Sequence, residues 1–126
     1  MLIRRKEDIT PTPVQMEGVK DISMRLMIGR EDGAPNFALR HFTVSPGGHS
    51  PRHSHNYEHE VIITAGEGQV EHDGEKSPIR SGDILFVEPN KVHQFVNQGD
   101  SPLEFLCLVP VSFDCGTDGV QTTPGS

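Results

Sequence analysis

The chain is poor in cysteine: Cys107 and Cys115 are the only two among 126 residues. Two cysteines at this spacing do not suggest a disulfide framework, which is the usual support of small secreted domains. Cys107 lies within the apolar segment 103–109, so we expect a free, buried thiol there, because free cysteine is among the most buried residue types. The low cysteine content is typical of a reducing compartment, and we expect a soluble, cytoplasmic protein.

Long apolar runs and basic stripes are also missing. No segment approaches the roughly 20 apolar residues that a membrane-spanning helix needs, and residues 1–5 lack the apolar core of a secretory signal peptide. Acidic residues outnumber basic ones by 18 to 11, which gives a formal net charge of −7. An acidic chain of this kind binds nucleic acids and membrane surfaces poorly. We therefore expect neither a nucleic-acid partner nor a membrane partner.

The chain does contain many short strand-like segments. Its 13 glycines and 10 prolines favour turns, and Asp73-Gly74 is typical of a hairpin turn. No segment has a notable helix pattern. Alternation, or a high content of β-branched and aromatic residues, predicts strands at 19–28, 36–45, 61–65, 69–72, 84–87, 93–97 and 103–109. Many short strands in a chain of this length predict one all-β domain, a sandwich, jelly roll or small barrel.

Three histidines lie close together in the segment 52–62. Alternate side chains of a β-strand point to opposite faces, so an extended segment would place His53, His55 and His59 on one side. Imidazole is the commonest metal ligand and suits zinc, copper, iron and nickel. His93 opens a later strand and is the candidate for a fourth ligand from outside this segment. The pattern predicts a metal site.

The histidines stand within two groups of residues. The first group is Gly47, His53-Ser54-His55, position 59 and Gly66, and the second is Gly82-Asp83, Glu88-Pro89-Asn90, His93 and Asn97. In these two groups the sequence resembles the two motifs of the cupin superfamily of small β-barrels. The resemblance covers roughly residues 36–109 and implies an antiparallel jelly-roll barrel around one divalent metal. In the second motif Asn90 takes the place of a turn glycine, which asparagine can do because it tolerates a positive φ.

Two residues compete for the usual glutamate position of the first cupin motif, His59 and Glu60. Strand alternation groups position 59 with the two preceding histidines and places Glu60 on the other face. The six-residue count to Gly66 also selects position 59. We therefore expect a metal bound by four histidines: His53, His55, His59 and His93.

Such a site is similar to that of the small single-domain cupins described as binding manganese. The resemblance implies one divalent transition metal, with manganese favoured and iron, zinc, copper or nickel as alternatives, because the ligand set does not choose among them. Four neutral imidazoles leave the full 2+ charge on the metal, which favours anionic ligands and acidifies bound water. Two open positions on an octahedral metal would suit a bidentate substrate, or O₂ or peroxide beside a substrate.

Four further residues are candidates for a substrate pocket. Phe95 and Cys107 face the barrel interior if their strands alternate from His93 and Phe105, and Phe105 shares that interior. Arg40 is the candidate positive group, by resemblance and by its place on the preceding strand. The alternative is that Phe95 and Cys107 only pack in the core and that Arg40 is solvated. Three other histidines are expected at the surface or in turns: His41, His49 and His72.

We expect three parts: an N-terminal arm at 1–18, a cupin domain at 19–113 and a flexible tail at 114–126. The resemblance implies a homodimer, in which the segment 19–28 is a candidate for a strand contributed across the interface. It also implies a small-molecule substrate or ligand. The favoured function is a metal-dependent, dioxygenase-like oxidoreductase, with no catalytic residue identified beyond the metal ligands. Two alternatives stay open, a non-redox isomerase or hydrolase and a non-catalytic binding or sensor protein, because one fold hosts all three classes.

Overall fold

The computed structural model describes residues 1–114, which contain nine strands, three short 3₁₀ helices and no α-helix. No helix in that range is long and apolar enough to cross a membrane. Each of the seven predicted strands is present. The strands are β1 (Thr12–Pro13), β2 (Lys20–Ile28), β3 (Phe37–His49), β4 (His59–Ala65), β5 (Glu67–His72), β6 (Glu75–Arg80), β7 (Ile84–Val87), β8 (His93–Val96) and β9 (Leu103–Pro110), and the helices are η1 (Lys6–Asp8), η2 (Arg30–Asp32) and η3 (Val111–Phe113).

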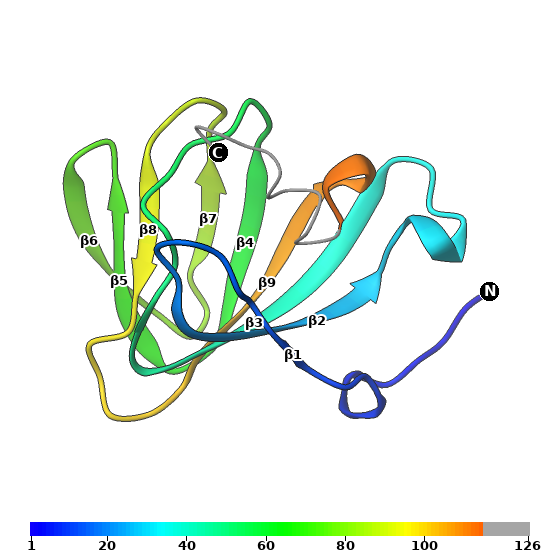
Figure 1. Ribbon diagram of the computed structural model, residues 1–126, viewed down its shortest axis with the longest axis horizontal. Coiled ribbons are helices and arrows are strands. Elements are labelled where there is room, and N and C mark those ends of the chain that lie inside the picture. Colours follow the sequence, from blue (N-terminus) through cyan, green and yellow to red (C-terminus); the bar gives the residue numbers. More distant parts are fainter. Residues whose placement is uncertain (115–126) are drawn as a thin grey trace.

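The strands pair antiparallel in the order β6-β5-β8-β3-β9-β4-β7, and β2 adds to β3 with β1 beside it. The long strand β3 belongs to both sides of the fold. It pairs with β2 and β9, and its last residue, His49, also pairs with Val96 of β8. Figure 1 shows the resulting curl, with β5, β6 and β8 on one side and β2, β3 and β9 on the other. The predicted jelly-roll barrel is confirmed.

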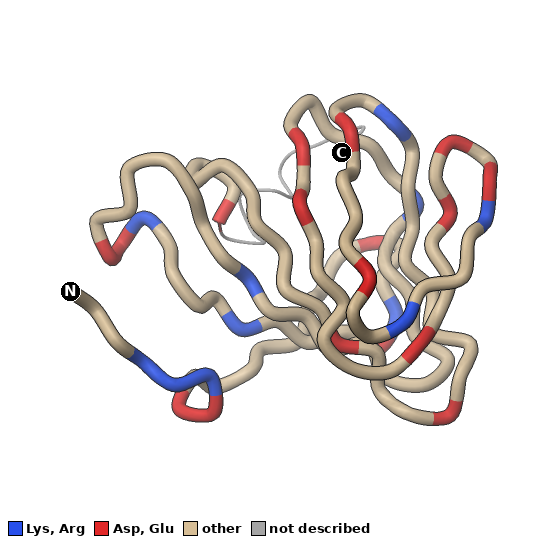
Figure 2. Tube along the Cα trace, turned by 180° about the vertical axis from the view of Figure 1, so that it is seen from behind, with Lys and Arg blue, Asp and Glu red and all other residues tan. Residues whose placement is uncertain are grey.

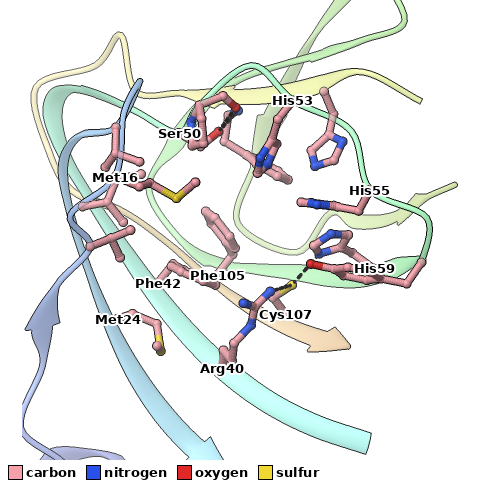
Figure 3. Close-up of a pocket in the computed structure, with 17 residues that line it drawn as sticks. Met16, Met24, Arg40, Phe42, Ser50, His53, His55, His59, Phe105 and Cys107 are labelled. Carbon is pink, nitrogen blue, oxygen red and sulfur yellow. Dashed lines mark hydrogen bonds between the residues drawn. The ribbon is translucent and has the colours of Figure 1, made fainter. Parts of the chain in front are cut away.

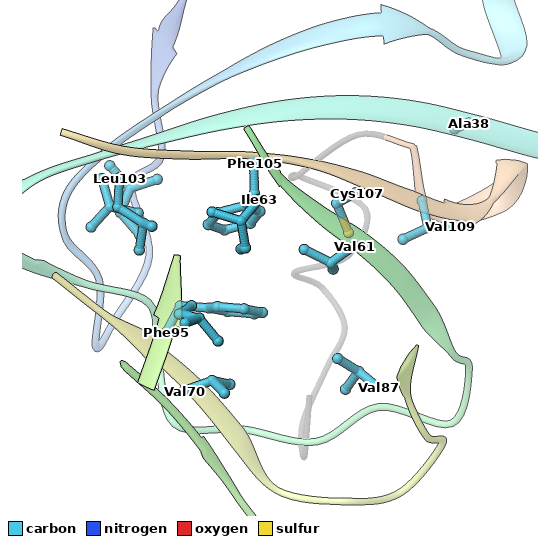
Figure 4. Packing of buried hydrophobic residues seen from close by; sticks show 13 residues of the cluster. Ala38, Val61, Ile63, Val70, Val87, Phe95, Leu103, Phe105, Cys107 and Val109 are labelled. Atoms are coloured by element: carbon cyan, nitrogen blue, oxygen red, sulfur yellow. The ribbon is translucent and has the colours of Figure 1, made fainter. Parts of the chain in front are cut away.

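The core lies inside this curl because the inner strands alternate. Along β9, Leu103, Phe105, Cys107 and Val109 are buried while their neighbours are partly exposed. Figure 4 shows Phe105 near Ile63 of β4, and the rings of Phe95 and Phe105 stack with centroids 4.7 Å apart. Burying each large apolar side chain stabilises the fold by about 1.5–3 kcal/mol. Cys107 is a free, buried thiol, as predicted, whereas Cys115 lies outside the described residues.

Three details of the strands differ from the sequence prediction or add to it. The two-residue strand β1 lies in a proline-rich segment where no strand was predicted. Strand β3 does not end at Pro46 but continues through Gly47 and Gly48 to His49. It can do so because Gly47 has a φ of 83° and because a Cβ on Gly48 would lie 2.6 Å from the Lys20 carbonyl oxygen, a space that only glycine leaves free. The predicted hairpin turn at Asp73-Gly74 implies a second strand after it, and the structure gives its bounds as those of β6, which contains Pro78. Strand β6 is an edge strand, where proline is tolerated.

His41 is buried rather than at the surface, so its predicted exposure is wrong. It lies on β3 with its side chain directed away from the barrel interior, and the N-terminal segment covers that face: Lys6 and His41 both contact Glu104, at 3.8 Å and 3.1 Å. The alternation of residues along β3 does not predict this burial, because it gives no sign that another segment covers the outer face of the strand. The predictions for His49 and His72 are compatible with the structure, in which both are partly exposed.

The ends of the described chain pack on the barrel. Strand β1 pairs with β2, and Val14 donates a backbone hydrogen bond to the Ile22 carbonyl. Asp114, the first residue of the predicted tail, is buried and 3.1 Å from Arg30. Residues 115–126 of that predicted tail lie outside the described part. Figure 2 shows Lys and Arg scattered along the chain, with one visible run near the N-terminus.

Candidate metal centre

Local backbone pairing brings the histidines together. His53 and His93 form an isolated β-bridge with two reciprocal backbone hydrogen bonds of 3.1 and 2.9 Å. The Asn90 amide donates to the His55 carbonyl at 2.6 Å, and Asn90 has a φ of 68°, so asparagine does take the expected left-handed conformation. His59 opens β4, where it pairs with Val87.

Three of the four histidines are positioned to bind one metal ion. Each of His53, His55 and His93 offers one ring nitrogen, and these three atoms lie within 4.8 Å of one another. His59 is not part of that group, but its ring centroid is 4.7 Å from that of His55 and 5.4 Å from that of His93. The fourth ring is thus adjacent to the triad, and its role as a ligand stays a prediction.

The orientation of the pair His59 and Glu60 follows strand alternation. His59 is buried and borders the cavity described below, whereas Glu60 is exposed on the outer face of β4. Both orientations are those predicted from the sequence. At the start of β4 the inner face therefore carries the neutral imidazole of His59 and not the negatively charged carboxylate of Glu60.

Two of the rings are held by a contact to Nδ1. The His93 Nδ1 lies 3.0 Å from the Lys91 carbonyl oxygen, which can only accept, so this nitrogen carries the proton and Nε2 keeps its lone pair. The His59 Nδ1 lies 3.2 Å from the Cys107 sulfur. Such contacts fix the ring orientation and the tautomer of metal-binding histidines.

Several ring nitrogens are buried without a hydrogen-bond partner, and this tests whether a metal fits. They are Nδ1 of His53, both nitrogens of His55 and Nε2 of His59. Leaving a buried polar group unsatisfied costs about 1–3 kcal/mol. A bound divalent metal would use such lone pairs, so the donor set fits a metal.

Burial also keeps the rings neutral. It lowers the pKa of His53 to about 4, helped by His93 and Arg40, and it lowers the pKa of His55 to about 3, helped by His53 and His93. Burial lowers the pKa of His59 well below its ordinary value, and Arg40 adds to this effect. The pKa of His93 is lowered by burial as well, against the opposing hydrogen bond to Lys91. Neutral imidazole is the form that binds metals.

A cavity of about 110 Å³ lies beside the histidines. Its lining includes all four predicted pocket residues, Arg40, Phe95, Phe105 and Cys107, together with all four histidines. Since one water needs roughly 10–15 Å³, the cavity has room for a small organic molecule.

Sequence reasoning missed part of the lining. Tyr57 shares the odd-numbered face of the histidine segment, a signal that was available, and its ring stacks on His55 and on Phe113 with centroids 4.6 and 3.8 Å apart. Val14 and Met16 come from the predicted N-terminal arm, and Met24 comes from β2. No local pattern shows that the arm forms a wall of the cavity, because that contact depends on how the arm returns to the barrel.

A small antiparallel barrel that holds clustered histidines beside an inner cavity is the arrangement that defines the cupins. The family model described as "Cupin domain" matches residues 40–109, and the chain belongs to this family.

Individual proteins and solved structures are also similar to this chain. Over 114 residues the chain is 31% identical to the oxalate-binding protein of Thermotoga maritima, covering 86% of this chain and 93% of that protein. It is 36% identical over 76 residues to the 1-methylthio-D-xylulose 5-phosphate methylsulfurylase of Rhodospirillum rubrum, covering 60% of this chain but 49% of that protein. Among solved structures, a polyketide cyclase from Streptomyces resistomycificus matches with a TM-score of 0.84 and 29% identity, covering 88% of this chain and 80% of that one.

Proposed function

We propose that this protein is a metal-dependent oxidoreductase, dioxygenase-like in type, that acts on a small organic substrate in the cavity. The observation that carries the proposal is the chemistry of the lining: in the described part of the chain it contains four histidines and no carboxylate. With the imidazoles engaged as ligands, the lining offers no carboxylate and no spare imidazole as a general base. Reactions whose chemistry comes from the metal are therefore favoured over acid–base chemistry by a carboxylate or an imidazole.

The residues proposed to hold the metal are His53, His55 and His93, with His59 as the fourth ligand. A divalent, redox-capable metal there would supply a Lewis acid and electron exchange with O₂ beside a bound substrate. Manganese is the metal we favour, from the resemblance of the ligand set. The chain's own part is to keep the imidazoles neutral by burial and to surround the substrate with apolar side chains that exclude water.

The test measures O₂ consumption and product formation by mass spectrometry. Protein loaded separately with Mn, Fe or Zn is given a panel of small organic acids, phenols and diketones. We expect turnover with Mn or Fe, none with Zn, and a loss of about 100-fold or more in His53→Ala. His72→Ala is the matched control, because His72 contacts Glu88 outside the cavity lining. Activity that survives both metal stripping and His53→Ala would overturn the proposal, and equal rates with Zn and Mn would point to a non-redox reaction.

A second candidate is a non-catalytic binding protein for a small organic acid. The observation that favours it is the similarity to a relative named for oxalate binding, since the chain covers 93% of that protein's length. Calorimetric titration with oxalate, followed by recovery of the ligand, separates the two. Stoichiometric binding with complete recovery of unchanged ligand, and no turnover of any panel compound, would favour the binding protein.

A further inference from the structure

Arg40 is a buried cation without an anionic partner. Its side chain is on the inner face of β3, and the residue is 8% exposed. The contacts of its guanidinium are the Cys107 sulfur, 3.5 Å from Nη2, and the face of the Phe42 ring, with Cζ 5.0 Å from the centroid. Its Nε has no hydrogen-bond partner. In contrast, Arg4, Arg30 and Arg52 each lie within 4.0 Å of a carboxylate oxygen.

An unpaired guanidinium inside a protein is costly unless a ligand supplies the missing charge. The cavity that Arg40 lines contains no carboxylate of residues 1–114. The planar guanidinium fork matches the two oxygens of a carboxylate. Burial without a partner, and exposure of the group to a cavity, together indicate that an anion from outside the chain completes this site.

The cavity is polar at one end and apolar at the other. Cys107 connects Arg40 to the histidines, since its sulfur is 3.5 Å from the guanidinium and 3.2 Å from the His59 ring. Figure 3 shows the labelled histidines gathered on one side and Met16 and Met24 on the opposite side. Val14, Val19 and Ile22 add further apolar side chains from the N-terminal segment and β2.

We propose that the cavity selects a small monocarboxylic acid with an apolar body, its carboxylate at the end formed by Arg40 and the histidines and its body against the wall around Met16. This assignment deepens the proposed function, on which its role as the substrate class rests. A dicarboxylate such as oxalate has no apolar body for this wall, and a sugar phosphate would place hydroxyls against the apolar side chains of the wall. The cavity, at about 110 Å³, has room for more than a single water, which suits a small acid.

The experiment measures dissociation constants by calorimetry for 3-phenylpropionate, 3-phenylpropionamide, oxalate and phenyl phosphate, on metal-free and Mn-loaded protein. We expect 3-phenylpropionate to bind about 10-fold or more tightly than oxalate and than phenyl phosphate. The uncharged amide should bind about 30-fold more weakly than the acid, because it cannot neutralise the guanidinium. With acetate added as a fifth ligand, Met16→Gln should weaken the binding of 3-phenylpropionate and leave the affinity for acetate unchanged.

Arg40→Gln should reduce affinity for the acid about 30-fold and bring acid and amide within about 3-fold of each other, and Arg40→Lys should restore part of the difference. Arg52→Gln is the matched control, since Arg52 pairs with Glu71 outside the cavity lining. Should Arg40→Gln fail to fold, the acid-to-amide ratio of the unaltered protein still decides. Equal binding of acid and amide, tighter binding of oxalate, or tighter binding of phenyl phosphate would overturn the assignment.

The two proposals fail differently. Acid binding that depends on Arg40, without O₂ consumption on any metal, would retain the ligand class and reject the oxidoreductase. Metal-dependent turnover confined to dicarboxylates or phosphate esters would retain the oxidoreductase and reject the ligand class.

Discussion

The four histidine rings differ in what holds them. His93 is fixed by a backbone carbonyl, which no side-chain substitution removes, whereas His59 contacts a side chain, the thiol of Cys107. His53 and His55 have buried Nδ1 atoms without a partner. Substitution of Cys107 can therefore alter the orientation of the His59 ring without removing an imidazole.

We expect Cys107→Val to weaken Mn binding about 10-fold, because the contact to His59 Nδ1 is lost, and Cys107→Ser to stay within about 3-fold of the original affinity. Competition with a chelator of known affinity measures both. Val109→Ala, two residues along the same buried face of β9, is the control: it should lower stability but leave Mn affinity unchanged. Equal Mn affinity in Cys107→Val and the unaltered protein would exclude a positioning role for the thiol.

The lowered histidine pKa values also predict how the metal-free protein responds to acid. In the unfolded chain a histidine protonates near pH 6.5, whereas the folded pKa is about 4 for His53 and about 3 for His55. The unfolded state thus binds more protons between these values, so this stability is fully present above pH 6.5 and is lost as the pH falls toward 3. We expect a lower thermal midpoint at pH 5 than at pH 7, and a shallower dependence in His55→Gln. A midpoint that rises on acidification from pH 7 to pH 5 would contradict this.

At the scale of elements, glycines determine where strands approach closely. Gly66, between β4 and β5, has a φ of 79°, and a Cβ there would collide with the Pro102 carbonyl oxygen of the neighbouring loop. Gly74, in the β5–β6 hairpin, has a φ of 91° but open space around it. Substitution of Gly74 therefore tests the cost of a positive φ alone, whereas substitution of Gly66 tests that cost together with a steric collision.

We expect Gly74→Ala to destabilise the protein by about 1 kcal/mol, from positive φ alone, and Gly66→Ala by about 3 kcal/mol or more, since the backbone must also move. Urea unfolding followed by circular dichroism measures both free energies. Comparable losses for the two variants would show that the close approach at Gly66 contributes little. Gly66 directly follows β4, the strand that begins at His59. We therefore also expect Gly66→Ala to weaken metal binding.

At the scale of the whole molecule, one outer face of the barrel has an apolar cluster beside Glu60, which pairs with Phe86. Ile62 of β4 pairs with Ile84 of β7, and Phe86 lies on the same face; they are 40%, 79% and 59% exposed. Strand β7 is at one end of the path of paired strands. Apolar side chains gathered in this way are typical of an interaction surface, which supports the expected homodimer.

We therefore expect light scattering after gel filtration to give twice the chain mass of 13.9 kDa. Phe86→Glu should shift the protein to the monomer, because it would bury a charge in the interface. Phe37→Glu, at a residue that is 63% exposed elsewhere, is the control and should remain dimeric. A monomeric unaltered protein, or a dimer unaffected by Phe86→Glu, would rule out this face as the interface.

The sequence by itself determined seven of the nine strands and the histidines of the cluster, because strand alternation and the motif spacing can be recognised without the fold. Alternation placed His59 inward and Glu60 outward, and the spacing of His53, His55 and His93 with the motif glycines carried the resemblance. These features require only that a few strands form in the right order. The left-handed conformation of Asn90 was also predictable, because it depends on the turn motif alone.

Only the tertiary structure decided which groups share the cavity and which have partners. The burial of His41 needs the N-terminal segment to return over β3, and the apolar wall at Met16 needs that same return. Whether Arg40 is solvated, paired or unpaired depends on every side chain within reach, and those come from strands far apart in the chain. Long-range packing leaves no periodic trace in the sequence, and in this protein it is what leaves a buried positive charge facing the cavity without a partner.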